Sequence, residues 1–284
     1  MAGIDLNTTT IALPKELSKK IIQNLQQDSA VMKLAEEVEL SGLGSIMPVI
    51  TGDPEPEWVT ETGKKPVKRP TLETKTMQPY TLAVIVPFSN QFKRNMPALY
   101  NAIVQRLPKA LAKKFDKTVF HGAAPGSNFD TLATCTAQSL GSDAYAALVA
   151  ADGDIADHDG LTNGFVIAPK AKSILLGATD KNGRPLFINN VAEGAVPMIL
   201  GSRTEQSKAA FKSDVSGDTV GFAGDWTKAM YGISDALSIS ISDQATLQDG
   251  DQIINLWQQN MFAVRCEIEC GFVADTTAFN RLTV

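Results

Sequence analysis

The chain has 284 residues, of which 44% are hydrophobic and 20% are charged, and its formal net charge is −5. This composition is typical of a soluble globular protein, and the acidic balance excludes a broad basic face for nucleic acid. The sequence has no apolar run near the ~20 residues of a membrane span, and its amino terminus does not resemble a signal peptide.

The first 13 residues are polar and without periodicity, which predicts an extended arm. Pro14 suits the first position of a helix, and Leu17, Ile21 and Leu25 follow it on one apolar stripe. A second apolar patch then ends at the breaker 41–44. The sequence therefore predicts an arm and a short helix ahead of the next segment.

Residues 48–80 are the most informative segment, because their charges are sorted by sign around Gly63. Acidic residues come first and basic residues follow: Asp53, Glu55, Glu57, Glu61, Lys64, Lys65, Lys68 and Arg69. Folded as a hairpin, each arm would reach roughly 40 Å at ~3.3 Å per residue. A lone two-stranded ribbon is marginal in water, so we expect these charges to contact another subunit. A disordered surface loop is the alternative.

An apolar strand and a long helix are predicted next. Residues 80–88 are apolar on both faces, which indicates a strand buried on both sides. Residues 95–120 carry an apolar residue at every fourth position, and Pro108 is expected to kink this helix. Its basic face is either solvated or in contact with a polyanion; it consists of Lys109, Lys113, Lys114 and Lys117.

A composition shift near residue 135 predicts a second α+β lobe. We expect helices over 142–151 and 170–178, an Asp-rich turn after the first, a turn at 180–183, and strands at 165–168, 220–223 and 237–241. The final strand is the clearest, because one face is apolar and the other charged. The apolar face comprises Phe262, Val264, Cys266, Ile268, Cys270 and Phe272.

The three cysteines, Cys135, Cys266 and Cys270, are expected to be free structural thiols in a reducing compartment. Cys266 and Cys270 would share a strand face roughly 13 Å apart, too far for a disulfide.

No common catalytic motif is found, so we predict no catalytic, cofactor-binding or metal site, no cofactor, and no enzyme activity. His121 is expected to cap the long helix. The segment Asp152–Gly160 resembles a calcium loop but lacks the required glycine and the final glutamate, so a solvated turn is the better interpretation.

The order of these elements resembles the major capsid proteins of tailed bacteriophages, which have the Hong Kong 97-type α+β fold. Local resemblances lie at Leu13–Ile22 and Asp28–Ala35, in the loop 48–80, in the helix 95–120, and at Phe165–Pro169, Asn182–Leu186, Gly224–Trp226 and Ala263–Phe279. The resemblance implies an N-terminal arm with a short helix (1–47), an extended loop (48–80), a peripheral domain with a spine helix (81–134), a mainly axial domain (135–245), and return strands to the peripheral domain (246–284).

By this resemblance the chain assembles with itself into hexamers and pentamers of an icosahedral shell around double-stranded DNA. It would assemble in the host cytoplasm and reside in the virion, touching DNA only weakly and non-specifically and no membrane. A separate scaffold, portal or cement protein is a further partner that the family allows. Because Met1 lies close to the arm helix, we expect no long amino-terminal scaffold. Lys64, Lys65 and Lys68 are candidate donors for the covalent crosslink that some members form.

Two other functions remain open at this point. An encapsulin-like nanocompartment shell shares the fold and would load protein cargo instead of a genome. A cytoplasmic α+β enzyme is the alternative from a different class, which a soluble monomer with measurable activity would favour.

Overall fold

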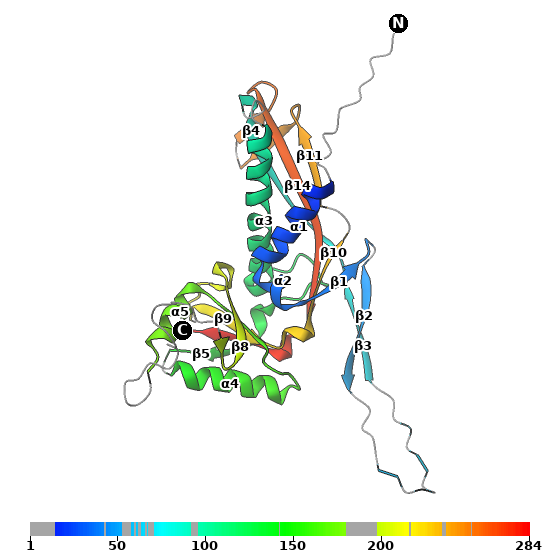
Figure 1. Ribbon diagram of the computed structural model, residues 1–284, viewed down its shortest axis with the longest axis vertical. Coiled ribbons are helices and arrows are strands. Elements are labelled where there is room, and N and C mark those ends of the chain that lie inside the picture. Colours follow the sequence, from blue (N-terminus) through cyan, green and yellow to red (C-terminus); the bar gives the residue numbers. More distant parts are fainter. Residues whose placement is uncertain are drawn as a thin grey trace.

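The computed structural model describes residues 15–42, 44–52, 58–59, 61, 64–65, 67, 71–91, 96–141, 143–179, 198–215, 217–234, 237–250 and 252–284. Two β-sheets lie one beyond the other along the long axis of the molecule, and a long helix runs beside both (Figure 1). Among the described residues, no helix is long and apolar enough to cross a membrane.

The first sheet is built around one long strand near the carboxyl end. Its strands are β1 (Glu36–Leu40), β4 (Tyr80–Ser89), β10 (Ala229–Ser234), β11 (Ser238–Ser242) and β14 (Met261–Ala274). Three helices complete this region: α1 (Lys15–Asp28), α2 (Ala30–Leu34) and α3 (Met96–His121). All six apolar residues predicted for the inner face of β14 are buried in the main core cluster, whereas Arg265 is exposed. The alternation predicted for this strand is confirmed.

The prediction that residues 80–88 are buried on both sides is wrong. In β4 only alternate residues, such as Leu82 and Val84, pack on the core, and Ile85 is 47% exposed. Thr81 and Ala83 are also exposed. The outer face of the first sheet therefore carries small and mixed side chains, which an antiparallel sheet tolerates in water.

The second sheet has six strands in the order β5-β15-β9-β6-β8-β7. Their bounds are β5 (Thr136–Ser139), β6 (Gly164–Ile167), β7 (Met198–Ile199), β8 (Ser202–Gln206), β9 (Thr219–Gly224) and β15 (Phe279–Thr283). Helices α4 (Ala144–Asp157) and α5 (Pro169–Gly177) pack on it through a second core cluster. Within the Asp-rich segment, residues 152–157 are thus the end of α4, because Ile155 is fully buried one helical turn after Ala151, and the predicted turn is confined to the residues directly after Asp157. The turn predicted at 180–183 lies outside the described residues.

The long helix α3 joins the two sheets by packing against both. Phe115 meets Phe272 of the first sheet edge to face at 6.4 Å between ring centroids. One turn later, Phe120 stacks on Phe222 of the second sheet at 4.8 Å. The helix is continuous through Pro108, which is buried, although a proline removes one backbone hydrogen bond there.

Two matching turns carry the chain from one sheet to the other. The segment Asp225–Lys228 leads from β9 into β10, and the segment Asp275–Ala278 leads from β14 into β15. The turns bond each other reciprocally: the Asp225 N–H donates to the Ala278 carbonyl at 3.0 Å, and the Asp275 N–H donates to the Lys228 carbonyl at 3.1 Å. This pair of turns, called the crossing below, makes one antiparallel ribbon continuous through both sheets.

Each turn of the crossing is capped by its own aspartate. Asp275 accepts hydrogen bonds from the backbone and hydroxyl of Thr277. Asp225, which is only 5% exposed, does the same for Thr227 and also accepts from the Leu161 N–H and the Asn163 amide, each at 3.0 Å. Asp225 therefore holds a neighbouring loop as well as its own turn.

A second buried carboxylate ties the amino-terminal helices to α3. Asp116 of α3 accepts from the Ser29 hydroxyl at 2.5 Å and from the Ala30 N–H at 2.9 Å. It thereby satisfies a free N–H at the start of α2, while Ser29 caps the Met32 N–H at 3.1 Å. Burial raises the pKa of Asp116, although its hydrogen bonds, led by that from Ser29, act in the opposite direction.

We expect Asp225→Ala to destabilise the chain more than Asp275→Ala. Loss of a cap costs about 0.5–2 kcal/mol, whereas Asp225→Ala also leaves part-buried donors of Leu161 and Asn163 without acceptors, at about 1–3 kcal/mol per buried group. Denaturant unfolding of unassembled subunits measures both. Equal losses in the two variants would contradict the wider role of Asp225.

The pH dependence of Asp116→Asn provides a separate test. The amide donates where the carboxylate accepted, so we expect a loss of about 1–3 kcal/mol in unfolding free energy. Because the folded pKa is raised, the wild-type carboxyl stabilises most below its ordinary value of 3.8 and loses that advantage as pH rises through the folded pKa. The difference in unfolding free energy between wild type and Asp116→Asn should therefore become smaller as pH rises.

Asp218→Asn is the control with the opposite sign. A hydrogen bond from Lys170, with one from Ser213, lowers the pKa of Asp218, so its contribution is lost as pH falls through that pKa. The difference in unfolding free energy between Asp218→Asn and wild type should therefore become smaller as pH falls. A gap for Asp116→Asn that widens as pH rises would show that its carboxylate is stabilised in the ionised form.

Candidate assembly interface

The extended loop predicted from the sorted charges begins as a β-hairpin. Strand β2 (Ser45–Gly52) pairs antiparallel with β3 (Thr71–Met77), from Ser45 opposite Met77 to Gly52 opposite Thr71. The hairpin projects away from the body of the molecule (Figure 1). This confirms an antiparallel hairpin at the base of the loop, whereas the pairing of the acidic and basic stretches and the turn predicted at Gly63 lie outside the described residues.

The base of the hairpin is fixed to the first sheet by Met77, which is fully buried with Leu40 and Val273. Gly232 and Gly271 lie opposite each other in the register of β10 and β14. A Cβ atom on Gly271 would lie 2.7 Å from the Met77 side chain, and one on Gly232 would lie 3.0 Å from its sulfur. The two glycines therefore form the recess that accepts Met77.

Lys75 makes a second attachment beside Met77. Its ammonium group donates to the Asp130 carboxylate at 3.0 Å and to the Ala274 carbonyl at 2.7 Å. Asp130 also accepts from the Ala274 N–H at 3.0 Å, so the three residues form a closed network. The hairpin is thus held to the end of β14, immediately before the crossing.

The far part of the loop is exposed wherever the structure describes it. Trp58 and Val67 have 105% and 88% of their surface exposed, so neither packs on the chain. Among the predicted contact residues, Glu61, Lys64 and Lys65 are also exposed. The others lie outside the described residues: Asp53, Glu55, Glu57, Lys68 and Arg69.

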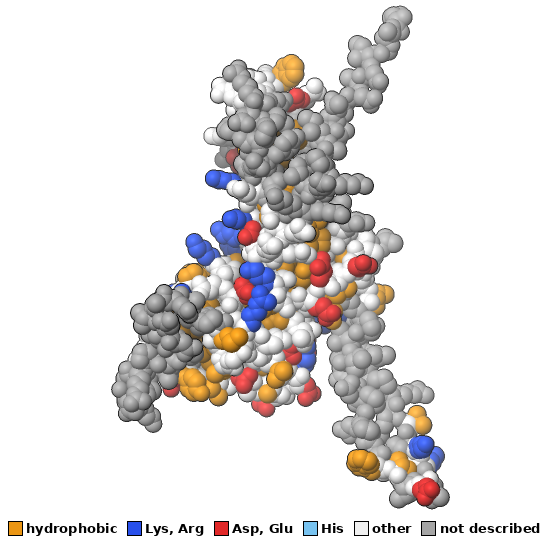
Figure 2. Space-filling view, viewed as in Figure 1, with side chains coloured by type: hydrophobic (Ala, Val, Ile, Leu, Met, Phe, Trp, Pro, Cys, Tyr) orange, Lys and Arg blue, Asp and Glu red, His pale blue; other side chains and the backbone are white. Residues whose placement is uncertain are grey.

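Other exposed apolar side chains lie at the outer ends of the molecule, and the sequence reasoning missed them. Tyr145 and Val149 on α4 are 47% and 45% exposed. Ile253 and Trp257 are 70% and 72% exposed beside the hairpin of β12 (Thr246–Asp249) and β13 (Gln252–Asn255). Figure 2 shows exposed hydrophobic side chains near the loop end and around the lower part of the second sheet. The apolar run at 144–151 was a usable signal, because it leaves no polar face for solvent.

The titratable groups show no arrangement suited to catalysis in the described residues. The His121 ring bonds the Ala210 carbonyl at 2.9 Å instead of the end of its own helix, which corrects the capping role predicted for it. Burial, followed by nearby cations including Lys212, lowers the pKa of His121. No cluster of three or more His, Cys, Asp or Glu capable of holding a metal occurs in the described part of the chain.

The three cysteines are buried and free, as predicted. Burial raises the pKa of Cys135 to about 12, of Cys266 to about 11 and of Cys270 to about 12. Since the thiolate is the reactive form, these side chains act as small hydrophobic groups in the core.

Comparison with known proteins identifies close similarity to viral shell proteins. The model of the "Phage capsid family" matches residues 9–284. The "Probable major capsid protein gp17" of Mycobacterium phage D29 is 31% identical over 284 residues, covering 95% of this chain and 89% of that protein. The "Major capsid protein" of Staphylococcus phage 80alpha is 21% identical over 286 residues, covering 95% of this chain and 84% of that protein.

Solved structures show the same fold. A chain from Gordonia phage Cozz has a TM-score of 0.72 at 21% identity, covering 90% of this chain and 86% of that one. A structure titled "Capsid of empty GTA particle computed with C5 symmetry" has a TM-score of 0.65 at 16% identity, covering 90% of this chain and 89% of that one.

These similarities confirm the Hong Kong 97-type α+β fold expected from the order of the elements. They support a shell-forming protein of the virion over a nanocompartment or an enzyme, since the named relatives are capsid proteins. The exposed extended loop and the apolar ends of the molecule are its candidate contact surfaces. With a family match over residues 9–284, the chain belongs to the phage capsid family and is a structural capsid protein, not an enzyme.

Proposed function

We propose that this chain forms hexamers and pentamers that close into an icosahedral shell around double-stranded DNA. The observation that carries the proposal is the extended loop, whose base is fixed by Met77 and Lys75 while Trp58 and Val67 at its far part remain exposed and pack on no described part of the chain. Large exposed apolar side chains on a projecting segment mark a contact with another molecule. In a closed homomeric shell that molecule is a second copy.

The sorted charges of the loop add to this contact across subunits. The eight residues proposed to take part are Asp53, Glu55, Glu57, Glu61, Lys64, Lys65, Lys68 and Arg69. An exposed ion pair contributes only about 0–1 kcal/mol. Each pair recurs at every subunit of a shell, so the total across the particle is large while each contact stays reversible during assembly.

The proposed division of labour follows ranges along the chain and only partly the two sheets, because β10 and β11 lie in the first sheet and β15 lies in the second. Residues 81–134 and 246–284 would form most of the peripheral domain, residues 135–245 mainly the axial domain, and residues 1–47 and 48–80 the arm and the loop. We infer assembly in the host cytoplasm, with a separate scaffold, portal or cement protein as further partners. DNA contact would be weak and independent of sequence.

Assembly of the purified chain tests this function. We expect size-exclusion chromatography with light scattering to show oligomers of five and six subunits or larger. Electron microscopy should show closed shells, either from the chain alone or with co-expressed virion proteins. A stable monomer under every condition, scaffold co-expression included, would overturn the proposal.

Truncation of Trp58 separates folding from assembly. Because Trp58 contacts nothing in its own chain, Trp58→Ala should leave the unfolding free energy within about 0.5 kcal/mol of wild type while reducing the yield of shells. Trp226→Ala is the control, since Trp226 is 1% exposed and its loss should cost about 3–5 kcal/mol. Both are measured by denaturant unfolding and by shell yield.

Charge variants extend the same comparison. Lys64→Glu with Lys65→Glu should impair assembly more than Lys64→Gln with Lys65→Gln. Reversing the charge makes the loop repel acidic side chains of a neighbouring subunit, whereas neutralising it only removes the attraction to them. Normal shells from both Trp58→Ala and the charge reversal would show that the loop is not a subunit contact.

A further inference from the structure

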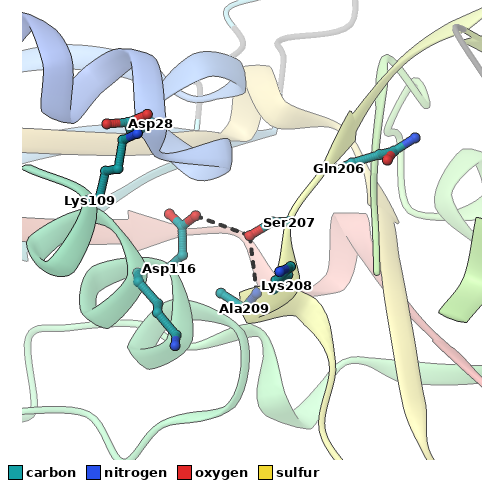
Figure 3. A pocket seen from close by; sticks show the side chains of 8 residues that line it. Asp28, Lys109, Asp116, Gln206, Ser207, Lys208 and Ala209 are labelled. Atoms are coloured by element: carbon teal, nitrogen blue, oxygen red, sulfur yellow. Dashed lines mark hydrogen bonds between the residues drawn. The ribbon is translucent and has the colours of Figure 1, made fainter. Parts of the chain in front are cut away.

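A basic hollow lies between the middle of α3 and the short 3₁₀ helix η3 (Lys208–Ala210), which follows β8. Its volume is about 210 Å³, and its lining includes Lys109, Lys113, Lys208, Asp28, Asp116 and Ser207. Figure 3 shows Lys109 and Asp116 on one helix, about two turns apart, with Ser207 opposite Asp116 and Lys208 beside it in the segment that follows β8. Two separate elements of the fold thus supply the lysines.

The acidic side chains that line the hollow balance the charge of its three lysines only in part. Asp116 is 2% exposed and bonded to Ser29 and Ala30, so its charge is already engaged. Asp28 is the remaining acidic side chain of the lining. Within the described residues, no ion pair is formed by Lys109, Lys113 or Lys208. The hollow is therefore a local excess of positive charge on a chain whose net charge is −5.

The excess of positive charge is not confined to the hollow. Glu205 on β8 is paired with Lys33 at 3.1 Å and with Arg203 at 2.8 Å. Lys33 and Arg203 thus share one carboxylate, and the excess of positive charge extends from the hollow to this nearby surface.

The positive charge continues along α3 beyond the hollow. Lys109, Lys113 and Lys117 recur every four residues, which places them about 6 Å apart along the helix axis. At the helix end, Lys212, Arg281 and Lys117 all lower the pKa of His121. Figure 2 shows blue side chains gathered beside the middle of the molecule. The basic surface is a strip and not an isolated spot.

We propose that this hollow binds phosphate groups of the backbone of duplex DNA; the proposal rests on the function proposed above, a shell that encloses DNA. Lysine ammonium groups bind phosphate as point charges, without the fork geometry that reads a base edge. The hollow has no aromatic lining on which a base could stack. Duplex DNA carries one charge per ~1.7 Å of its axis, so a duplex lying along α3 presents phosphates to each lysine.

The salt dependence of binding measures the number of lysines involved. We would titrate a short fluorescent duplex of random sequence with unassembled subunits across low salt concentrations. Each phosphate neutralised contributes roughly −0.9 to the slope of log K against log salt. Lys109→Gln with Lys113→Gln should reduce the magnitude of that slope by about two, and Lys208→Gln alone by about one.

Lys172→Gln is the matched control for Lys208→Gln, because it removes the same charge on α5, away from α3 and outside the hollow. An equal reduction of the slope in this control would show diffuse attraction and overturn the site, as would an unchanged slope in Lys109→Gln with Lys113→Gln.

The acidic arm of a neighbour's loop is the competing occupant. If Lys109→Gln with Lys113→Gln blocks shell formation without DNA and leaves the slope unchanged, the hollow is a protein contact and the proposal is wrong. If wild-type shells form normally but the slope is unchanged in Lys109→Gln with Lys113→Gln, only this site is overturned. If the wild type fails to form shells, the proposed function itself is overturned.

Discussion

The reciprocal hydrogen bonds of the crossing constrain the rest of this structure. Asp225 and Asp275 each start one turn, and the backbone N–H of each aspartate donates to the carbonyl of the last residue of the other turn. The two paired segments of the chain therefore leave one sheet and enter the next together. Because the chain passes between the sheets at matched positions, Ala229 remains opposite Ala274 and Gly224 remains opposite Phe279. A slip of one residue would turn both strands to their wrong faces in both sheets.

The crossing also determines where the loop can point. Lys75 attaches to Ala274, the last residue of β14, directly ahead of the turn at Asp275. Met77 occupies a recess in the same two strands, at Gly232 and Gly271. The projecting hairpin is therefore held at the most constrained part of the body. A stiff base suits a segment whose far part must meet another molecule at a defined place.

The sequence allowed the elements with strong local patterns to be predicted. The alternation in β14, the apolar stripe of α3 and the two arms of the hairpin follow from period and charge, which are properties of neighbouring residues. The crossing was missed because Asp225 and Asp275 are fifty residues apart, and only strand register brings them together. The recess for Met77 was missed for the same reason.

Other errors arose where tertiary packing overrides local composition. An Asp-rich run reads as a turn, yet buried Ile155 keeps it helical. An apolar strand reads as doubly buried, yet Ile85 on its outer face remains half exposed. Among the candidate contact residues, the sequence pointed to the charges of the loop but not to Trp257, because no strict periodicity around it separates an exposed face from a buried one.

The burial of the thiols has a consequence for the life of a particle outside a cell. With a pKa of about 12, a thiol such as Cys270 is ionised in only about one chain in a hundred thousand at neutral pH. Disulfide exchange proceeds through the thiolate, so these positions resist disulfide formation in an oxidising medium. The thiols of a shell built from such subunits therefore keep the same form when the surrounding medium becomes oxidising.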